Sequence, residues 1–555
     1  MPRPIDLLRQ GREEDLWRMC CGFINLSLEQ LMIIQKRLLA EQIELLKGCE
    51  LGRKMMRGAM PETVEEFREQ VPLTTYTDYL PELEERKEEI LPANPAIWVH
   101  TTGRPTEYSV KRVPFSERFL YEFEKTAGGL GLLASCDSQG NYLAKEHLKT
   151  LSATGSRYYG SGIVAYMMQQ ALGTDLLPSN AEEMAFPRKV KAGFKEALSQ
   201  WFDCFGGLSA VLVYVGDMCK RGAANVGARF LLSHPKALFR VIRGLARSKL
   251  ARRPMLPKDL WSLKVVVGGG ADSAVFRKKV EELWGRRPLE LYAGTEGGVY
   301  ATQTWDYEGM TFIPNLNFFE FIPEMEWFKW QLDHSYQPKT VLLDEVKAGE
   351  NYEIVITNFH GGIMTRYRIG DMVRIISLRN EKLDIDIPQM VFHGRADDLI
   401  NIAGFGRITE KTIWKAIENA DIPYVDWTAR KEIVGGRPIL NLYVELKDNY
   451  IASEKSIVAA VYDELLKLDR MYRYNIYSTY GDPESVLGLK PIQVTLLPHG
   501  AFSNYIAQRQ AEGVDSGHLK PPHINPSDEV LSLLGTPRGE VEVAPAIEFE
   551  RIAVV

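Results

Sequence analysis

Asp371 is the residue of this chain whose type and position most suggest chemistry. It ends the string Tyr-Arg-Ile-Gly-Asp at 367–371, which follows the apolar run 352–357. A strand that runs into a Gly-Asp turn would place this carboxylate at a strand end, where it can accept hydrogen bonds from the two vicinal hydroxyls of a ribose. Gly-Asp is also common in plain turns, so the motif alone leaves both interpretations open.

A second candidate follows the predicted strand 289–293. Tyr292 and Gly294 lead into Thr295, Glu296 and two further glycines. Glycines allow backbone amides to approach an anion closely, and a threonine hydroxyl can hydrogen-bond a phosphate oxygen. Glu296 is a hard oxygen ligand of the kind that Mg²⁺ binds. A tight turn with a solvated glutamate is the competing interpretation.

A glycine triplet at 268–270, followed by Ala271, comes directly after the apolar run 263–267. Backbone without side chains, here at Gly269 and Gly270, would let a flat purine lie against a strand end. A plain turn explains the same residues.

A loop rich in threonine and glycine, residues 100–107, resembles a phosphate-binding loop. Hydroxyls and amides of Thr101, Thr102 and Gly103 would hold a polyphosphate, and Lys111 would supply the cation that such a loop needs. A surface turn is the alternative.

The elements that must position these residues alternate between strands and helices. Strand, glycine turn and helix succeed one another after residue 261, which predicts an α/β fold with a mostly parallel sheet and ligand sites at its strand ends. Helices are expected at 26–56 and 77–91, short extended pieces from 97, mainly helices at 186–260, strands within 311–378, and then helix 409–419, strand 438–447, helix 451–470 and strand 492–497. The last part indicates a compact α+β domain.

Together these motifs, with a Gly-Arg-Ala-Asp-Asp string at 394–398, resemble the adenylate-forming superfamily. The similarity is strongest to the acyl-acid amido synthetases, which are the plant auxin- and jasmonate-conjugating enzymes and their bacterial relatives. Further matching pieces are 71–76, 317–323, 498–502 and 517–522. The resemblance covers about residues 20–525. It implies an N-terminal adenylation domain, residues 1–393, with mixed or parallel sheets, and a small mobile α+β domain, residues 394–555, with a tail at 526–555.

The resemblance also implies a role for each matching residue, with ATP and Mg²⁺ as cofactors. For the nucleoside, Asp371 would hold the ribose, Tyr292 and the backbone at Gly269, Gly270 and Ala271 would frame adenine, and Gly294 would lie near the nucleotide. For the phosphates and the metal, Thr295 would contact the α-phosphate, Glu296 would bind the metal, and Arg395 would reach phosphate or ribose. Asp397 would be the hinge between the domains, and Lys520 would act in adenylation. A mobile lysine suits that role, because it brings positive charge to the phosphorus as negative charge builds.

The first loop departs from the family pattern. In one register the family's lysine is absent and Thr106 or Glu107 replaces it. In the other, which we prefer, Lys111 serves after a one-residue insertion and precedes an Arg-Val-Pro string. The stretch 135–166, which includes a Ser-Ala-Thr-Gly-Ser string at 152–156, has no clear counterpart and could shape the acyl pocket.

The implied reaction is carboxylate activation by ATP. A small carboxylic acid would attack the α-phosphorus, giving an acyl-adenylate, and an amine, first of all that of an amino acid, would displace AMP. Transfer to coenzyme A is one alternative. A nucleotide- or acyl-binding homologue without catalysis is another, since the first loop is altered.

Composition and charge limit the partners and the cellular location that we expect for this protein. The 555 residues carry a formal net charge of −6, which does not suggest nucleic acid or an anionic membrane as a general partner. The basic stretch 240–253 indicates a charged helix face, or otherwise a membrane or partner contact. Six cysteines without CxxC spacing argue against zinc and disulfides. The chain shows neither a signal peptide nor a run of 18 apolar residues, so we expect no membrane span and a cytoplasmic protein.

Overall fold

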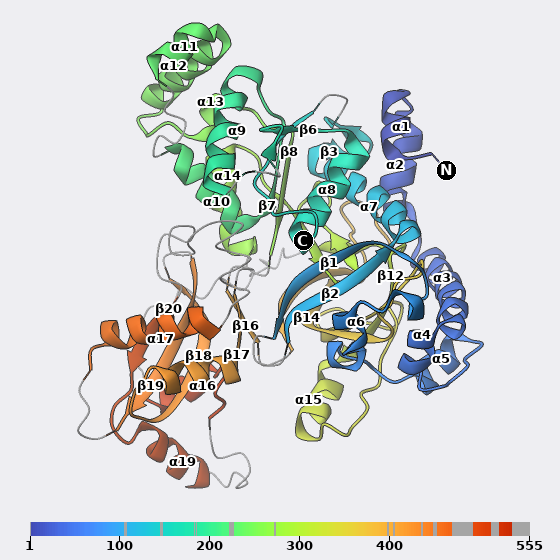
Figure 1. Ribbon diagram of the computed structural model, residues 1–555, viewed down its shortest axis with the longest axis vertical. Coiled ribbons are helices and arrows are strands. Elements are labelled where there is room, and N and C mark those ends of the chain that lie inside the picture. Colours follow the sequence, from blue (N-terminus) through green and yellow to red (C-terminus); the bar gives the residue numbers. More distant parts are fainter. Residues whose placement is uncertain are drawn as a thin grey trace, which may run out of the picture. The chain divides into compact units, whose positions relative to one another are not determined.

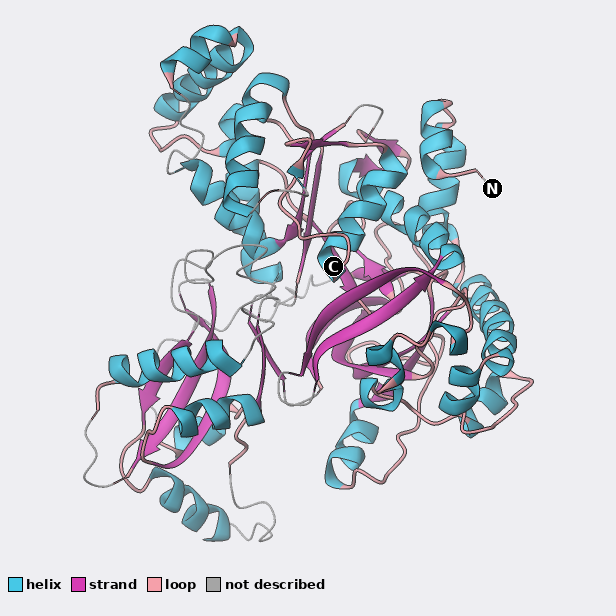
Figure 2. Cartoon of the chain, viewed as in Figure 1, coloured by secondary structure: helices cyan, strands magenta, loops and turns pink. Residues whose placement is uncertain are grey.

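Contacts divide the chain into two compact units. The computed structural model describes residues 2–104, 108–144, 148–181, 184, 186–220, 227–270, 273–396, 399–402, 406–434, 437–447, 452–468, 492–511 and 521–535. The larger unit holds 1–101, 110–273 and 277–397, and the smaller holds 102–109, 274–276 and 398–555. The division at 393/394 stays a prediction. Figures 1 and 2 show the elements of both units.

The larger unit is built on a sheet of 11 strands in the order β12-β13-β14-β15-β11-β10-β9-β8-β7-β5-β6. The strands are β5 (Lys149–Leu151), β6 (Asp175–Leu177), β7 (Cys204–Leu208), β8 (Val265–Gly269), β9 (Leu289–Gly294), β10 (Gly298–Thr302), β11 (Met310–Phe312), β12 (Asn317–Pro323), β13 (Asn351–Asn358), β14 (Tyr367–Ser377) and β15 (Gln389–Arg395). The predicted α/β fold with mixed sheets is confirmed. All neighbours from β12 to β9 are antiparallel, whereas β9, β8, β7, β5 and β6 run parallel.

The expectation of a mostly parallel sheet is therefore wrong for the half that follows β9. The predicted rhythm holds at β8, whose glycine turn leads into the helix α14 (Ser273–Trp284). After β9, however, the chain turns through Thr295 and Gly297 and returns as β10, beside the strand it has just left. A turn this short can join only antiparallel strands, because a parallel partner needs a long crossover.

Helices surround this sheet (Figure 2). They are α1 (Pro4–Arg9), α2 (Glu13–Cys21), α3 (Leu28–Gly48), α4 (Glu50–Met55), α5 (Val64–Gln70), α6 (Glu82–Glu85), α7 (Glu117–Ser135), α8 (Gly160–Leu172), α9 (Phe186–Gln200), α10 (Ser209–Met218), α11 (Ala228–Ser233), α12 (Pro235–Leu250), α13 (Pro257–Leu260), α14 and α15 (Glu324–Leu332). The helix expected at 26–56 is confirmed as α3 and α4, and Ser27 caps α3 by accepting from the Gln30 amide. No helix in the part of the chain that the structure describes is long and apolar enough to cross a membrane.

Two expectations of secondary structure, one helical and one extended, are wrong in part. Residues 77–91 form only short turns, η2 (Tyr76–Tyr79), α6 and η3 (Glu88–Ile90). After 97, the hairpin β1 (Pro95–Arg104) and β2 (Tyr108–Ser116) is extended as expected, but α7 and α8 are helices. Glycines in α7 hide its periodicity, yet they are needed for packing: a Cβ on Gly129 would lie 2.5 Å from the Cys20 carbonyl oxygen.

The smaller unit is the expected α+β structure. Strands β18 (Tyr424–Val434), β19 (Arg437–Leu446) and β20 (Ile492–Leu496) form one sheet, and β16 (Leu399–Ile402) pairs with β17 (Gly406–Thr409). Its helices are α16 (Glu410–Asn419), α17 (Glu454–Leu468), α19 (Ala501–Ala511) and α20 (Asp528–Leu533). Helix α20 lies in the tail for which the sequence showed no periodicity.

Candidate active site

The sequence suggested that Asp371 lies in a turn at a strand end. In the structure, its carboxylate lies inside a strand instead. Val355 pairs with Arg368 and Glu353 pairs with Met372, so three residues of β14 bulge opposite Ile354. Gly370 takes a φ of +77° there, a conformation that favours glycine. The bulge re-aims the backbone at Asp371 while β14 continues to Ser377.

Both oxygens of Asp371 are engaged by side chains that the sequence also singled out. The Tyr292 hydroxyl donates to Oδ2 at 2.8 Å, and Arg395 Nη1 donates to Oδ1 at 2.5 Å. Asp371 and Arg395 face each other in the β14–β15 ladder and are 13 % and 9 % exposed in their side chains. Tyr292, Asp371 and Arg395 therefore form one polar cluster, which we call the Asp371 cluster.

Tyr292 reaches this cluster from a distant strand. Four strand-to-strand steps separate β9 from β14, which in a flat sheet would mean about 19 Å. The 2.8 Å hydrogen bond therefore requires the sheet to curl. Burial, followed by the charge of Asp371, raises the pKa of Tyr292 well above its ordinary value, so the phenol stays a hydrogen-bond donor.

Lys111 and Glu296 form a second cluster. Lys111 Nζ donates to Glu296 Oε1 at 2.8 Å and to the Tyr367 hydroxyl at 2.8 Å. The ammonium also lies 5.6 Å and 5.5 Å from the ring centroids of Tyr76 and Tyr367. A buried ion pair of this kind needs good geometry and further hydrogen bonds to balance its desolvation, and this pair has both. We call Lys111, Glu296 and Tyr367 the Lys111 cluster.

Neighbouring segments hold both clusters in place. Thr74 and Tyr367 form a parallel bridge, which brings the 71–76 segment alongside the start of β14 and Tyr76 toward Lys111. Asn317 donates to the Gly297 carbonyl at 2.8 Å, and Asn358 donates to the Glu296 carbonyl at 3.1 Å. These amides fix the turn that carries Thr295 and Glu296.

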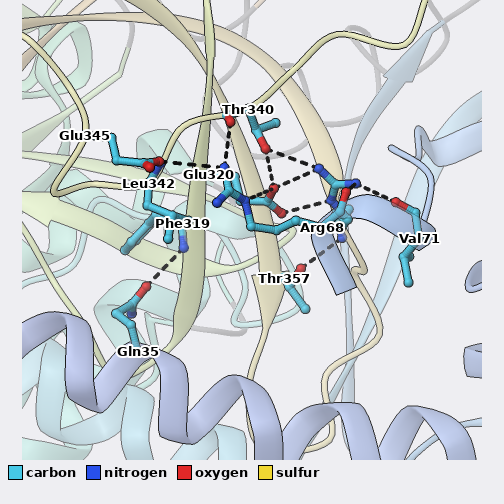
Figure 3. Close-up of polar contacts among 10 residues, drawn as sticks. Gln35, Arg68, Val71, Phe319, Glu320, Thr340, Leu342, Glu345 and Thr357 are labelled. Carbon is cyan, nitrogen blue, oxygen red and sulfur yellow. Dashed lines mark hydrogen bonds and ion pairs between the residues drawn. The ribbon is translucent and has the colours of Figure 1, made fainter. Parts of the chain in front are cut away.

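A buried arginine anchors the chain just before β14. Arg366 donates to both oxygens of Glu320, at 3.0 Å and 2.8 Å, and to the Val71 carbonyl at 2.5 Å. In Figure 3, Arg68, Glu320 and Thr340 converge on this network from separate segments. It ties β12 and the 71–76 segment to the start of β14, and so sets where Tyr367 and Asp371 lie.

Thr295 lies against a helix that sequence reasoning did not place. A Cβ on Gly160 would be 2.4 Å from Thr295 Oγ1, so the first turn of α8 packs directly on this hydroxyl. The chain before α8 is held by a hydrogen bond from the His100 amide to the Tyr158 carbonyl at 2.7 Å, and the His100 ring packs on Tyr158 and Tyr159. The Ser-Ala-Thr-Gly-Ser string at 152–156, typical of a loop before a helix, was the available signal.

The other predicted positions are less informative. Gly269 ends β8 and Gly270 follows it with a φ of +105°. Thr101, Thr102 and Gly103 continue β1 as a strand instead of forming a loop, and the side chain of Thr102 is outside the described part. Three predicted residues lie outside the described residues altogether: Ala271, Asp397 and Lys520.

The donor set fits a metal bound through one protein carboxylate. No group of three His, Cys, Asp or Glu side chains in the described ranges could hold a metal by itself. Glu296 already lies 2.8 Å from a cation, the Lys111 ammonium. One buried carboxylate suits Mg²⁺, which keeps several waters and completes its shell with substrate phosphates.

Two segments of the chain that contribute residues to this site match models of a known protein family. Residues 20–175 match the GH3 family N-terminal domain, which includes Lys111, and residues 310–395 match the GH3 family central domain, which includes Asp371 and Arg395. The chain is similar to the GH3 family over these two ranges. The resemblance to acyl-acid amido synthetases is thereby confirmed.

Curated GH3 relatives align over part of the chain. Jasmonoyl–L-amino acid synthetase JAR4 of Nicotiana attenuata is 29 % identical over 281 residues, which are 47 % of this chain and 44 % of that protein. The 4-substituted benzoates–glutamate ligase GH3.12 of Arabidopsis thaliana is 26 % identical over 241 residues, 41 % of this chain and 38 % of the relative. The chain thus matches less than half the length of these relatives.

Solved structures show the same fold over nearly the whole chain. The GH3.15 acyl acid amido synthetase superposes with a TM-score of 0.50 at 16 % identity and covers 93 % of this chain and 96 % of its own. 2-Hydroxyisobutyryl-CoA ligase in complex with 2-HIB-AMP and CoA gives a TM-score of 0.54 at 14 % identity, with coverage of 94 % and 93 %. The chain shares its α/β fold with both kinds of ligase.

Proposed function

We propose that this protein is an ATP-dependent, AMP-forming ligase that activates a small carboxylic acid as an acyl-adenylate and transfers the acyl group to the amine of an amino acid. The observation that carries the proposal is the pair of buried clusters in the larger unit. One offers a carboxylate held by tyrosine and arginine, and the other offers a lysine and a glutamate beside a threonine turn.

The Asp371 cluster suits a nucleoside. Asp371 is bonded to Tyr292 and Arg395 in place, so its carboxylate is oriented before a ribose arrives. A carboxylate has about four lone-pair sites, and each oxygen can therefore keep its protein donor and accept a ribose hydroxyl. Preorganised groups of this kind lose little entropy on binding.

The Lys111 cluster suits a triphosphate. Phosphate oxygens and a bound Mg²⁺ would share the Lys111–Glu296 pair between them, with lysine toward phosphate and glutamate toward the metal. When bound, Mg²⁺ supplies charge neutralisation of the phosphates. Thr295 precedes Glu296 in the same turn and could donate its hydroxyl to the α-phosphate.

In the first step, an oxygen of the substrate carboxylate bonds to the α-phosphorus, and the bond from that phosphorus to the bridging oxygen breaks to release pyrophosphate. In the second, the amine attacks the acyl carbon, the carbon–oxygen bond to AMP breaks, and one amine proton is released. We propose Lys520 as the group that neutralises charge in the first step and Asp397 as the hinge; we also expect the reaction to occur in the cytoplasm.

Exchange of labelled pyrophosphate into ATP tests the first step. With a panel of aromatic and aliphatic carboxylic acids, we expect acid-dependent exchange that chelation of Mg²⁺ abolishes. Asp371→Asn should weaken ATP binding about tenfold to a hundredfold, while the exposed Asp384→Asn should not change it. Lys520→Ala should slow exchange and leave ATP binding intact.

The mass of the product identifies the acceptor. We expect an amide when amino acids are supplied and no thioester with coenzyme A. A thioester product would show that the protein is a coenzyme A ligase and not an amide synthetase. Measurable ATP binding without exchange for any acid would instead indicate a binding protein that does not catalyse.

A further inference from the structure

Helix α12 packs against the rest of the larger unit through one narrow face. Ala237, Gly244 and Ser248, which are its buried residues, lie along that face. A Cβ on Gly244 would come within 2.8 Å of Leu260, so α12 packs very closely on the short helix α13. Arg240 adds hydrogen bonds to the Ala197 and Leu198 carbonyls of α9. The orientation of α12 about its own axis is therefore fixed.

The opposite face of α12 is apolar and exposed. A helix turns once in 3.6 residues, so Phe239, Ile242, Ala246 and Leu250 follow one another along the side away from Gly244. Phe239 is 66 % exposed, Ile242 55 % and Leu250 88 %. We call these four residues the α12 ridge. On the adjoining α11, which Figure 1 draws beside α12, Leu232 is exposed as well.

Positive charge lines both sides of the α12 ridge. Lys236 and Arg247 lie along one edge and Lys249 along the other, and all three are exposed. From 218 to 258 the sequence contains no aspartate or glutamate. This charge is local: the chain as a whole carries −6, but the Debye length in physiological salt is only about 8 Å.

We propose that the α12 ridge is an interfacial anchor that binds the protein to the surface of an anionic lipid bilayer. Large apolar side chains on a helix, flanked by lysine and arginine in a sequence stretch without acidic residues, fit the boundary between acyl chains and negatively charged headgroups. The apolar side chains enter the boundary while the basic side chains contact lipid phosphates. A single protruding ridge suits a deformable lipid surface better than a preformed protein groove, and its charge selects anionic lipid.

Co-sedimentation of the full chain with vesicles tests the proposal, and it requires neither ATP nor a carboxylic acid. We expect binding to phosphatidylcholine vesicles that contain about 30 mol % phosphatidylserine, and little binding to pure phosphatidylcholine. Raising the salt from about 0.1 M to about 0.5 M should weaken the binding, since it screens the headgroup charge.

Two variants test the two parts of the surface. Phe239→Ser with Ile242→Ser should reduce vesicle partition about tenfold or more, because it removes the apolar groups that would be buried. Arg247→Gln with Lys249→Gln should reduce partition to anionic vesicles to a similar degree. All four residues are exposed in the structure, so the thermal unfolding midpoint should not change.

Matched controls keep the interpretation specific. Ile33→Ser with Met325→Ser removes two apolar side chains of similar exposure, 61 % and 68 %, from α3 and α15. Lys278→Gln with Lys411→Gln removes the same charge from exposed positions on α14 and α16. Neither control should alter partition.

Three results would overturn the proposal. These are failure to bind anionic vesicles, binding that the Phe239/Ile242 variant retains, and binding that the controls lose equally. Light scattering gives the rival result: if the chain dimerises, loses the dimer in the Phe239/Ile242 variant and ignores vesicles, the ridge is an interface between two copies of the chain.

Discussion

The Lys111 ammonium lies 2.8 Å from Glu296 Oε1, and both side chains are more than nine-tenths buried. Two residues 185 positions apart thus meet as an ion pair at the centre of the candidate site. Each of them neutralises the other, so neither can be removed alone without leaving a buried charge.

Lys111→Met should therefore destabilise the protein by about 3–5 kcal/mol in urea unfolding, because it leaves the Glu296 carboxylate buried without its cationic partner. The double variant Lys111→Met with Glu296→Gln should be more stable than Lys111→Met alone, since no charge is then left unpaired. The coupling from a double-mutant cycle should reach about 1–3 kcal/mol. Strictly additive losses would show that the two residues do not stabilise one another.

Tyr292→Phe should weaken ATP binding without unfolding the protein. The variant removes only the hydroxyl that donates to Asp371 at 2.8 Å, a hydrogen bond to a charged group that contributes about 1.5–3 kcal/mol. Calorimetric titration should show affinity lower by about tenfold or more. Tyr336→Phe is the control, since its hydroxyl donates to Glu326 at 2.6 Å, outside both clusters; an equal loss of affinity there would argue against a specific role for Tyr292.

The sequence located most of the candidate site but not its internal contacts. Asp371, Arg395, Tyr292 and Glu296 each belong to a short motif whose residue types have a chemical meaning by themselves. The hydrogen bond from Tyr292 to Asp371, in contrast, depends on the order of five strands and on the curl of the sheet. Neither is encoded in a local pattern, because strand pairing is set by long-range packing.

Local patterns also misled where packing overrides propensity. Three glycines in α7, Gly128, Gly129 and Gly131, lower helix propensity, but they let α7 approach α2 and α8 closely. The bulge at Gly370 gave the same sequence signal as a turn, since both need a positive φ. The fold class was predictable because the apolar strand, glycine turn and helix at β8 and α14 are typical of an α/β fold.

Gly160→Ala should impair the first chemical step more than stability. The new Cβ would lie 2.4 Å from Thr295 Oγ1, so the hydroxyl must move from its present position. We expect pyrophosphate exchange at saturating ATP to fall by about tenfold, which is less than the roughly hundredfold to thousandfold loss typical when such a donor is removed altogether. Gly48→Ala, at the end of α3 with open space around it, should leave exchange unchanged. Unaltered exchange in Gly160→Ala would mean that the position of Thr295 does not matter.

Arg366→Met should be among the most destabilising single changes in the larger unit. Arg366 and Glu320 are 6 % and 1 % exposed, and the substitution would leave the Glu320 carboxylate buried without its main partner. We expect a loss of about 3–5 kcal/mol in urea unfolding. Arg379→Met breaks an exposed pair with Asp384 and should cost less than about 1 kcal/mol. Similar losses in the two variants would contradict the anchoring role of Arg366.

His523 should make the stability of the smaller unit depend on pH. Its two ring nitrogens lie 2.9 Å from Asp426 and 2.8 Å from Glu410, and the hydrogen bond to Asp426, before that to Glu410, raises the pKa of the imidazole above its ordinary value. A raised pKa in the folded state means that the stabilisation is complete below the unfolded pKa of about 6.5 and is lost as the pH rises through the folded value.

His523→Gln should therefore lower the thermal unfolding midpoint at about pH 6 and have a smaller effect at about pH 9, where the wild-type imidazole is neutral. The substitution should also affect the segment that follows Lys520 in sequence, because the Ala429 amide donates to the His523 carbonyl at 2.8 Å and holds that segment. His393→Gln, an exposed histidine of the larger unit, should show no such difference. An equal loss at both pH values would show that His523 stabilises the fold by packing on Trp427 and not by charge.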